Sequence, residues 1–547
     1  MEIPKSTFKD KRFSNHKRLL KIGASILITT LLLLLGFHLE SNNKVLNTLS
    51  YYTVVVDCGS TGTRVNVYEW MVEGNTVSVT NRDLPILIHS YPDNETRGST
   101  LWKNSCQYHC LQTEPGLDKF VNDSLGVRQK LEPLIVWAEN LVPNERHGET
   151  PVFVLATAGL RRLAVHDSDR VLDGVEAVLK DHSFLYRKSW VRVLNGREEA
   201  YYGWVALNYK MGSFGNYNPN SSPTLGVLDL GGSSLQIMAE VDGVVDEVHE
   251  MRSNIGSVEH QIVAYSFPAF GLNEAFDRTV VMLKNNQSME RTRNISQVRH
   301  PCLISTFVQN YTTTKKTELN FLSLIGEPDW EQCKKVATAA AMNSSNFNVL
   351  LPTIGKNSRA GSFSDIGTGI LNLTAIAHQI KRYHALSGFF FVYNKLKLSP
   401  KANLTAIWES GKQICSNLWT SSSNISDNPN YAGQFCFQVA YMASLIEYGL
   451  CLGDVEIVFG PGDVSWTLGA ALVEGNFLWL NTSSHKAQSF FSTLKNVKVM
   501  SSPTLLFAVL LFLLFIVNCS QMKLPMPSRR ASSPSLSLPS HVRHRSI

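Results

Sequence analysis

Residues 54–70 read VVVDCGSTGTRVNVYEW, and this stretch decides the fold. An apolar run ends in an acid, a loop of glycine, serine and threonine follows, and the next residues alternate between apolar and polar side chains. Since alternation with a period of two predicts a strand, the stretch predicts a β-hairpin. A tight turn of this composition directs several main-chain N–H groups to one point, which suits an anion such as phosphate. The sequence shows neither the P-loop signature nor the dinucleotide-binding fingerprint, in both of which a helix follows the loop.

The hairpin has a counterpart further along the chain. Residues 225–241 read LGVLDLGGSSLQIMAEV and repeat the order of apolar strand, aspartate, small-residue loop and alternating strand. Two such hairpins, centred on Asp57 and Asp229, indicate an internally duplicated α/β protein. Further strands are predicted over 151–156 and 190–194, each followed by a helical pattern. Strands that alternate with helices favour mixed or parallel sheets covered by helices, with a ligand site between the halves.

The two aspartates predict a site for a divalent cation. Asp57 and Asp229 each close a strand and begin a loop, so their carboxylates can flank one ion while both loops hold its phosphates. Magnesium or calcium, as a hard ion, keeps several waters and accepts carboxylate and phosphate oxygens.

Two further motifs have both a functional and a purely structural interpretation. In FVLATAGLRRL, residues 153–163, a small-residue turn opens a helix whose N-terminus offers donors to an anion, although a crowded crossing also favours small residues. In LNGREEAYYGWVAL, residues 194–207, Glu198 and Glu199 open a helix, where acids commonly complement the helix dipole. Arg64 and Arg161 are interpreted as structural donors, and Cys58 as a small buried apolar residue.

Both ends of the chain carry an apolar run. Residues 22–37 are uncharged and follow seven lysines and arginines, and residues 505–517 are wholly apolar. These patterns predict transmembrane helices over 22–39 and 502–519, with a basic tail over 1–21 and a disordered tail over 520–547 in the cytoplasm. The alternative of a cleaved signal peptide is disfavoured by the long basic region and by the lack of a small-x-small cleavage site. Runs this short suit the Golgi or another endomembrane better than the plasma membrane.

The composition between the spans indicates a luminal glycoprotein. The net charge of +6 comes largely from the tails, so it predicts a membrane topology and no nucleic-acid partner. N-glycosylation sequons recur throughout this segment. They begin at Asn94, Asn122, Asn220, Asn286, Asn294, Asn310, Asn343, Asn372, Asn403, Asn424 and Asn481.

The cysteines suit an oxidising compartment. The expected disulfides are Cys106 with Cys110, Cys302 with Cys333, and Cys415 with Cys436, and the odd cysteine count leaves at least one thiol. A zinc site is the alternative, but no paired C-x-x-C spacing is present. Residues 285–348 show little periodicity and are interpreted as a surface insertion.

Five motifs together carry a resemblance to a known family. They are DCGSTGTR at 57–64, ATAGLRRL at 156–163, GREEAYYGW at 196–204, DLGGSSLQ at 229–236 and SWTLG at 465–469. Their order resembles the five conserved regions of the nucleoside triphosphate diphosphohydrolases, or apyrases, and most of all the two-span plant apyrases and Golgi-type nucleoside diphosphatases. The resemblance implies an actin-like fold with two RNase H-like lobes and a membrane helix at each end. The lobes are expected over 50–194, completed by 463–485, and over 195–462.

The resemblance also implies roles for individual residues. Glu199 matches the base that deprotonates the attacking water, Ser234 and Gln236 match the residues that hold this water, and Asp57 and Asp229 match carboxylates that bind Ca²⁺ or Mg²⁺ through water. The remaining matches are nucleotide-binding positions. They are Ser60, Thr61, Gly62, Thr63, Thr157, Ala158, Gly231, Gly232, Ser234, Phe390, Phe391 and Trp466.

The sequence departs from the family pattern at several positions. Gly62 occupies a position where many cell-surface members have histidine, and Ala200 one where glycine is usual. Leu272 replaces an arginine, and phenylalanines replace a tyrosine, in the two stretches that hold the base. Phe390 or Phe391 can still stack on a base, and the alternative is that this aromatic run is a core strand.

These observations predict a membrane-anchored, luminal, metal-dependent hydrolase of nucleoside di- or triphosphates. Hydrolysis of a phosphoanhydride needs positioning, neutralising charge and a base within reach of the water. The alternatives are another actin-fold phosphohydrolase, such as a polyphosphatase, and a catalytically silent glycoprotein that binds nucleotide.

Overall fold

The computed structural model describes most of the central part of the chain. The described residues are 50–71, 84–92, 111–214, 224–241, 249–256, 259–286, 296–311, 322–343, 380, 382–420 and 429–480. The predicted membrane spans, both tails and the Cys106–Cys110 pair lie outside these residues. Within them, no helix combines the length and the apolar character that a membrane crossing requires.

The first sheet is built around the opening hairpin. Its strands run in the order β3, β2, β1, β5 and β6, and β4 pairs with β2. β1 is antiparallel to β2 and parallel to β5, so the predicted hairpin and the predicted strand after residue 150 are neighbours. The bounds are β1 Ser50–Cys58, β2 Thr63–Met71, β3 Ile86–Tyr91, β4 Gln112–Thr113, β5 Val152–Ala156 and β6 Val191–Val193.

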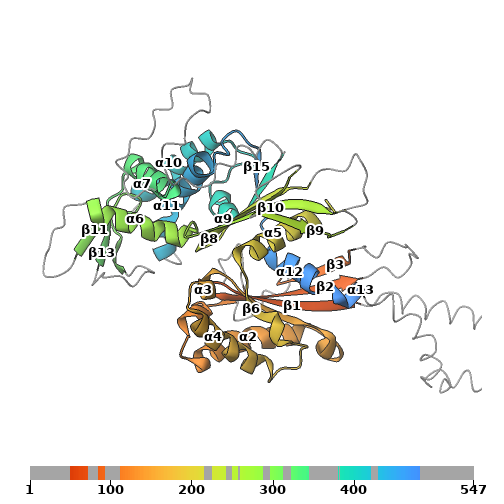
Figure 1. Cartoon of the computed structure of the whole chain (residues 1–547). Coiled ribbons are helices and arrows are strands. Elements are labelled where there is room, and N and C mark those ends of the chain that lie inside the picture. Colours follow the sequence, from red (N-terminus) through yellow and green to blue (C-terminus); the bar gives the residue numbers. More distant parts are fainter. Residues whose placement is uncertain are drawn as a thin grey trace, which may run out of the picture. The chain divides into compact units, whose positions relative to one another are not determined.

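Helices cover both faces of this sheet, which explains why β1 is continuously apolar. Val54 and Val56 face a core that includes α2 and α4, whereas Val55 faces a core that includes α5 and α12. Figure 1 shows α2 and α4 together on one face of the sheet. The bounds are α2 Ser124–Leu141, α3 Ala158–Arg161, α4 Val165–Leu179, α5 Gly196–Lys210, α12 Trp466–Glu474 and α13 Phe477–Leu480, with short 3₁₀ turns at Leu117–Lys119, Asn144–Glu149 and Lys188–Trp190.

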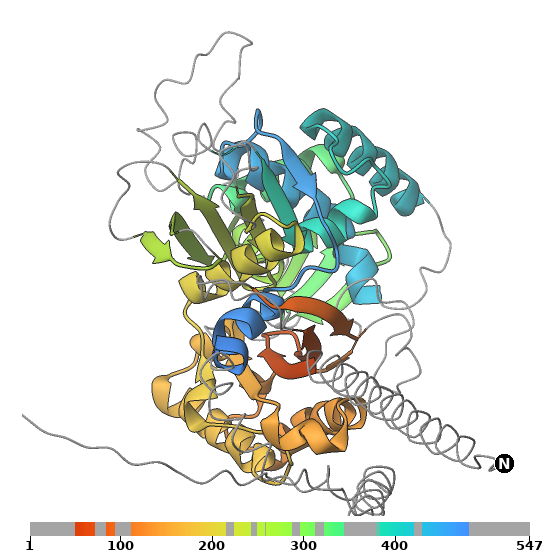
Figure 2. The ribbon, with the colours of Figure 1, turned by 90° about the vertical axis from the view of Figure 1, so that its right-hand side faces the viewer.

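The second sheet is built around the second hairpin. Its strands run in the order β15, β14, β7, β8, β10 and β9, with β7 antiparallel to β8 and parallel to β14. The face opposite α5 packs against a large group of helices, as the view in Figure 2 also shows. The bounds are β7 Gly226–Leu230, β8 Ser234–Glu240, β9 Glu250–Ser253, β10 His260–Pro268, β14 Tyr383–Ser387, β15 Ile457–Phe459, α6 Leu272–Asn286, α7 Trp330–Ala341, α9 Gly388–Asn394, α10 Leu404–Thr420 and α11 Pro429–Ser444, followed by a π-helical turn at Leu445–Gly449.

One core is shared by the two sheets. Val55 and Phe153 from the first sheet and Val227 and Met238 from the second belong to the same buried cluster, together with side chains of α5 and α12. Burial of this apolar surface stabilises the arrangement of the two hairpins that the site requires.

The segment predicted as a surface insertion is largely part of the second core. A small sheet, with β11 Ser296–His300 and β12 Val308–Tyr311 on either side of β13 Leu322–Gly326, precedes α7, whose residues Cys333, Val336 and Ala337 are buried. The interpretation as a surface insertion was therefore wrong for these residues. Eight of the twelve residues of α7 are buried, so this helix belongs to the core of the second sheet.

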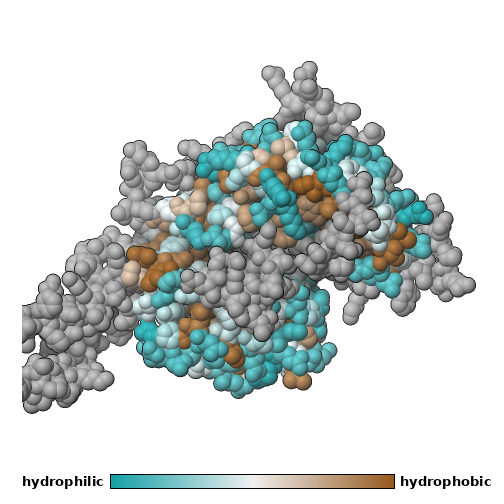
Figure 3. All heavy atoms as spheres, turned by 180° about the vertical axis from the view of Figure 1, so that it is seen from behind, coloured by the Kyte–Doolittle hydropathy of each residue, from teal (hydrophilic) through white to brown (hydrophobic). Residues whose placement is uncertain are grey.

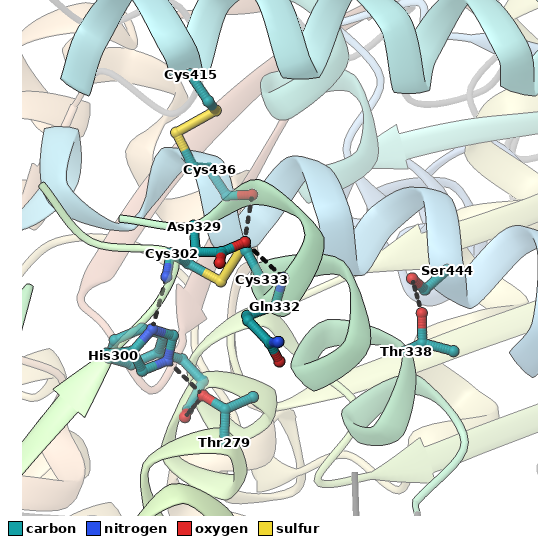
Figure 4. The surroundings of a disulfide bond; sticks show 11 residues. Thr279, His300, Cys302, Asp329, Gln332, Cys333, Thr338, Cys415, Cys436 and Ser444 are labelled. Atoms are coloured by element: carbon teal, nitrogen blue, oxygen red, sulfur yellow. Dashed lines mark hydrogen bonds between the residues drawn. A yellow bond between two sulfur atoms is a disulfide. The ribbon is translucent and has the colours of Figure 1, made fainter. Parts of the chain in front are cut away.

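Two of the predicted disulfides are confirmed. Cys302 bonds to Cys333 and Cys415 to Cys436, and the Cys333 sulfur lies 3.8 Å from the Cys436 carbonyl oxygen (Figure 4). Beside them, His300 is fully buried, and its Nε2 lies 2.9 Å from the Thr279 hydroxyl. Cys58 and Cys451 are free thiols.

The described surface is mainly hydrophilic with scattered apolar patches, as seen from behind in Figure 3. Large exposed apolar side chains come from several different elements of the described part. They are Ile86, Ile88, Leu125, Val136, Val165, Met211, Val281 and Val308.

Candidate active site

The two hairpins match residue for residue. Each turn closes with the same hydrogen bond, from Gly59 N to Gly62 O at 3.0 Å and from Gly231 N to Ser234 O at 2.9 Å. Asp57 and Asp229 each lie two residues before the donor glycine, so they occupy equivalent positions at the ends of β1 and β7. Both are nearly buried, with 4% and 9% of their surface exposed.

The structure brings the two predicted phosphate loops together. The Ser233 hydroxyl donates to that of Ser60 over 3.1 Å, and a Cβ on Gly232 would lie 3.4 Å from the Thr61 methyl group. Ser233 was missed by the sequence prediction, because only contact with the other loop distinguishes it from its neighbours. Thr63 lies in β2 opposite Cys58 and is fully buried, outside the loop.

The predicted turn at Thr157 packs against the first loop. Thr157 N donates to the Cys58 carbonyl over 3.2 Å, and a Cβ on Gly159 would lie 3.0 Å from Ser60 Cα. Thr157 and Ala158 therefore lie beside Ser60, as the phosphate-binding prediction requires.

Gly62 is fixed by a close backbone approach. A Cβ at this position would lie 2.7 Å from the Thr113 carbonyl oxygen, because β4 pairs with β2 directly after the turn. No side chain fits here without a shift of the backbone of β4. The close approach of β4 thus explains why this chain has glycine at position 62, where many cell-surface members of the family have histidine.

Asp57 is a buried carboxylate with one satisfied oxygen. Arg64, opposite it on β2, donates to Oδ2 over 3.2 Å, and Oδ1 has no hydrogen-bond partner among the described residues. Burial raises the pKa of Asp57, and Arg64 opposes this shift. Arg64 also reaches Gln112 and Thr61, which confirms it as a structural donor of the first loop.

Asp229 has a different environment. Burial raises its pKa to about 6, a hydrogen bond with Ser387 lowers it, and the negative charge of Asp57 raises it further. Ser387 is the N-terminal cap residue of α9, so this helix is tied to the second aspartate.

The two glutamates in the first turn of α5 make different contacts. Asn195 and Glu198 form a reciprocal capping box, and Glu198 also pairs with Arg192 over 2.7 Å. Glu198 is thus the structural acid of the pair. Glu199 is outside this capping box and only 12% of its side chain is exposed, so it is the acid of the pair that can serve the candidate active site.

Glu199 has the electrostatics of a general base. Burial raises its pKa to about 7, Arg161 lowers it, and Asp229 and Asp57 raise it. A base whose pKa lies near the working pH combines a useful ionised fraction with sufficient basicity.

Arg161 contacts the candidate base directly. Its Nη2 donates to Glu199 Oε2 over 2.8 Å and its Nη1 to the Leu194 carbonyl over 3.2 Å. The sequence prediction gave Arg161 only a structural role. The motif ATAGLRRL contains two adjacent arginines, and nothing in their spacing shows which one faces Glu199.

Ser234 and Gln236 lie on the same face of β8, as alternate strand residues do. Gln236 Nε2 lies 2.6 Å from the Ser234 hydroxyl and 3.5 Å from Glu199 Oε2. The residues predicted to hold the water are thus adjacent to the predicted base.

The three predicted nucleotide-binding aromatic residues lie far from the two loops in sequence and differ in their surroundings. The alternative of a core strand was wrong, because Phe390 and Phe391 belong to helix α9. A Cβ on Gly462 would lie 2.2 Å from the Phe390 ring, and the Lys395 ammonium lies 4.2 Å from the centre of the Phe391 ring. Trp466 is 8% exposed and stacks on Tyr202 within the shared core.

The site as a whole concentrates negative charge. Asp57 and Asp229 both raise the pKa of Glu199, so three carboxylates lie within electrostatic reach of one another. Among the described residues, no three histidine, cysteine or acidic side chains form a direct metal-ligand cluster. The unpartnered Oδ1 of Asp57 fits a cation bound through water, since an unpaired buried carboxylate oxygen is costly.

Comparison with known proteins places the chain among nucleoside phosphatases. A model of the GDA1/CD39 (nucleoside phosphatase) family matches residues 43–488. The chain is 35% identical over 489 residues to the protein named probable apyrase 7 from Arabidopsis thaliana, and the match covers 86% of this chain and 62% of that protein. It is 25% identical over 508 residues to ectonucleoside triphosphate diphosphohydrolase 1 from Mus musculus, covering 85% and 88% of the two chains.

A more distant relative and a solved structure agree with this placement. The Golgi apyrase from Saccharomyces cerevisiae is 24% identical over 474 residues, covering 78% of this chain and 70% of that protein. A crystal structure of nucleoside triphosphate hydrolases from Neospora caninum matches with a TM-score of 0.53 and 14% identity, covering 84% of this chain and 99% of that one. At this identity the structural match shows the fold alone, and it confirms the predicted α/β class with two lobes.

The family model covers both hairpins, the turn at Thr157, the first turn of α5 and the helix that begins at Trp466. These are the elements that carry all five sequence motifs. The chain therefore belongs to the GDA1/CD39 (nucleoside phosphatase) family.

Proposed function

We propose that this protein hydrolyses the terminal phosphoanhydride of nucleoside di- or triphosphates and releases phosphate. The arrangement around Glu199 carries the proposal. A buried glutamate with a pKa raised to about 7 lies 3.5 Å from the Gln236 amide, and two contacting glycine- and serine-rich loops complete the site.

The two loops bind the phosphate chain in this proposal. Main-chain N–H groups of Ser60, Thr61, Gly231 and Gly232 act as anion donors, and Thr157 and Ala158 add the turn beside them. Fixed backbone donors of this kind stabilise the charge on the transferring phosphoryl group.

A divalent cation, Ca²⁺ or Mg²⁺, completes the site. Asp57 and Asp229 would hold it through its water shell, which matches the unpartnered oxygen of Asp57. When bound, the ion neutralises charge on the phosphate oxygens. It also offsets the repulsion among the three carboxylates.

Glu199 then removes the proton from the attacking water. Ser234 and Gln236 hold this water against the base, and Arg161 keeps the Glu199 carboxylate ionised and oriented. Water attack on the terminal phosphorus breaks the phosphoanhydride bond, and the products are inorganic phosphate and the shortened nucleotide.

For the nucleoside, we propose stacking of the base on Phe390 at the start of α9. One side of this ring is supported by the backbone at Gly460 and Gly462, and α9 is tied to Asp229 through Ser387. Such stacking contributes roughly 1 to 3 kcal/mol and tolerates different bases. Phe391, the next residue on α9, has the Lys395 ammonium over its ring, whereas Trp466 packs on Tyr202 in the shared core.

We further propose an actin-like pair of lobes, over 50–194 with 463–485 and over 195–462, between two membrane spans. The matching hairpins support the duplication, and the two disulfides suit a luminal or extracellular domain. Both termini would then be cytoplasmic, with the Golgi or another endomembrane favoured.

The test measures phosphate release by the full chain in detergent with Ca²⁺ or Mg²⁺. Substrates are a panel of nucleoside di- and triphosphates and inorganic polyphosphate. We expect Glu199→Gln to lower the rate at least about 100-fold, since it removes the base.

Glu198→Gln is the matched control and should retain activity, because Glu198 serves the helix cap. Equal rates for the wild type and Glu199→Gln would refute the mechanism, and turnover of polyphosphate alone would favour the polyphosphatase alternative.

A further inference from the structure

Ser266, on β10, completes the contacts of the Gln236 amide. The two residues are direct neighbours across the antiparallel β8–β10 pair, so their side chains lie on the same face of the sheet. The Ser266 hydroxyl lies 3.3 Å from Gln236 Nε2. Neither the sequence motifs nor the expected roles include this serine.

The Gln236 amide nitrogen has more acceptors than hydrogens. Its NH₂ group carries two hydrogens, and three oxygens surround it, from Ser234 at 2.6 Å, Ser266 at 3.3 Å and Glu199 at 3.5 Å. With the nitrogen directed at these acceptors, the carbonyl oxygen of the amide is the atom left to accept a hydrogen bond from the attacking water. The orientation of this amide therefore decides whether Gln236 can hold the water.

Ser266 also contacts the helix that carries Glu199. A Cβ on Gly196, the first residue of α5, would lie 2.0 Å from the Ser266 hydroxyl oxygen and 2.4 Å from its Cβ. Gly196 thus permits the first turn of α5 to approach β10 at this serine. One side chain contacts both the water-holding glutamine and the start of the helix with the base.

We propose that Ser266 is a positioning residue for the hydrolysis, which holds the Gln236 amide in the orientation that presents its carbonyl oxygen to the attacking water. The inference rests on the proposed function. It adds a residue outside the predicted motifs, which acts through Gln236 and touches no substrate.

The test is steady-state kinetics of Ser266→Ala in the full chain with Mg²⁺ and a nucleotide that the wild type hydrolyses. We expect kcat to fall about three- to tenfold, the effect of one neutral hydrogen bond, with KM within twofold of the wild type. The acidic limb of the pH profile should stay in place, because Ser266 makes no contact that sets the charge of Glu199.

A double-mutant cycle with Gln236→Ala tests whether Ser266 acts through the glutamine. In that background we expect Ser266→Ala to change kcat by less than twofold. Ser444→Ala is the control for loss of a serine hydroxyl, because Ser444 is a buried serine in another part of the second core, with its hydroxyl 2.9 Å from that of Thr338. Its kcat should equal that of the wild type.

Three results would overturn the inference. They are a kcat for Ser266→Ala within twofold of the wild type, a change in KM alone, and an equal loss of kcat with and without Gln236. Failure of the proposed function is separate, since it would show as equal rates for Glu199→Gln and the wild type.

Discussion

The two hairpins share one backbone and differ in the residue opposite the aspartate. In the first, Arg64 faces Asp57 and pairs with it over 3.2 Å. In the second, Gln236 occupies the same position opposite Asp229 and extends to Ser234 and Glu199. The first hairpin therefore pairs its acid with a cation of its own, whereas the second directs its side chain to Glu199, the proposed base.

The turns differ in the same sense. Gly62 at the end of the first turn has no room for a side chain, whereas the equivalent Ser234 uses its hydroxyl to hold Gln236. In the proposed function, the duplication thus supplies two similar anion-binding loops, and differences at two positions divide binding from catalysis between them. The positive charge of the second site comes instead from Arg161 on α3, outside either hairpin.

The largest effect is expected when the second hairpin receives the arginine of the first. Gln236→Arg should lower kcat at least about 100-fold, because a guanidinium there pairs with Glu199 or Asp229 and cannot accept a hydrogen bond from water. Steady-state phosphate release measures the loss. Gln332→Arg, at an exposed position on α7, adds the same charge far from the hairpins and should be active. Full activity of Gln236→Arg would show that this position has no part in catalysis.

A smaller effect is expected when the external arginine is removed. Burial raises the pKa of Glu199 to about 7 and Arg161 lowers it, so Arg161→Ala should raise this pKa further. Because the base acts only when ionised, the acidic limb of kcat should move to higher pH. We expect the rate to fall about tenfold or more at pH 7 and to recover partly at pH 9.

A kcat profile from pH 5.5 to 9.5 checks this expectation. Arg162→Ala is the matched control, because the adjacent Arg162 pairs with Glu274 instead of Glu199. Its acidic limb should coincide with that of the wild type. An unchanged limb in Arg161→Ala would show that another group limits the rate at low pH.

The sequence predicted local features of the fold well. The apolar runs before Asp57 and Asp229 and the alternation after them specified both hairpins, because those patterns depend on near neighbours. The strand alternative for Phe389–Phe391 and the interpretation of 285–348 as a surface insertion, in its described residues, were wrong. The structure of both segments is decided by distant packing, against the 460–462 loop and the helices of the second core.

The site residues show the same contrast between features set by near neighbours and features set by distant packing. Asp57, Glu199, Asp229 and Gln236 were identified from motifs, and the structure brings Glu199 and Gln236 within 3.5 Å. Arg161 and Ser266 were missed as active-site contacts, since each depends on a partner more than 25 residues away. Such contacts arise from tertiary packing and leave no periodic trace in a single sequence.

The smallest effect is expected when the turn of the first hairpin receives the serine of the second. In Gly62→Ser the new Cβ would lie 2.7 Å from the Thr113 carbonyl oxygen, so β4 must shift away from β2. Overpacking of this kind costs about 1 to 3 kcal/mol of stability. Because Glu199 and Gln236 are untouched, kcat should stay within about threefold of the wild type, and the disturbed first loop should raise the nucleotide KM.

Thermal unfolding measures the loss of stability, and steady-state kinetics measure kcat and KM. The control is Gly148→Ser, because no atom lies within 4 Å of a new Cβ at that position. A loss of kcat with unchanged KM would show that the first hairpin takes part in the chemical step, and the division between the two hairpins would then be wrong.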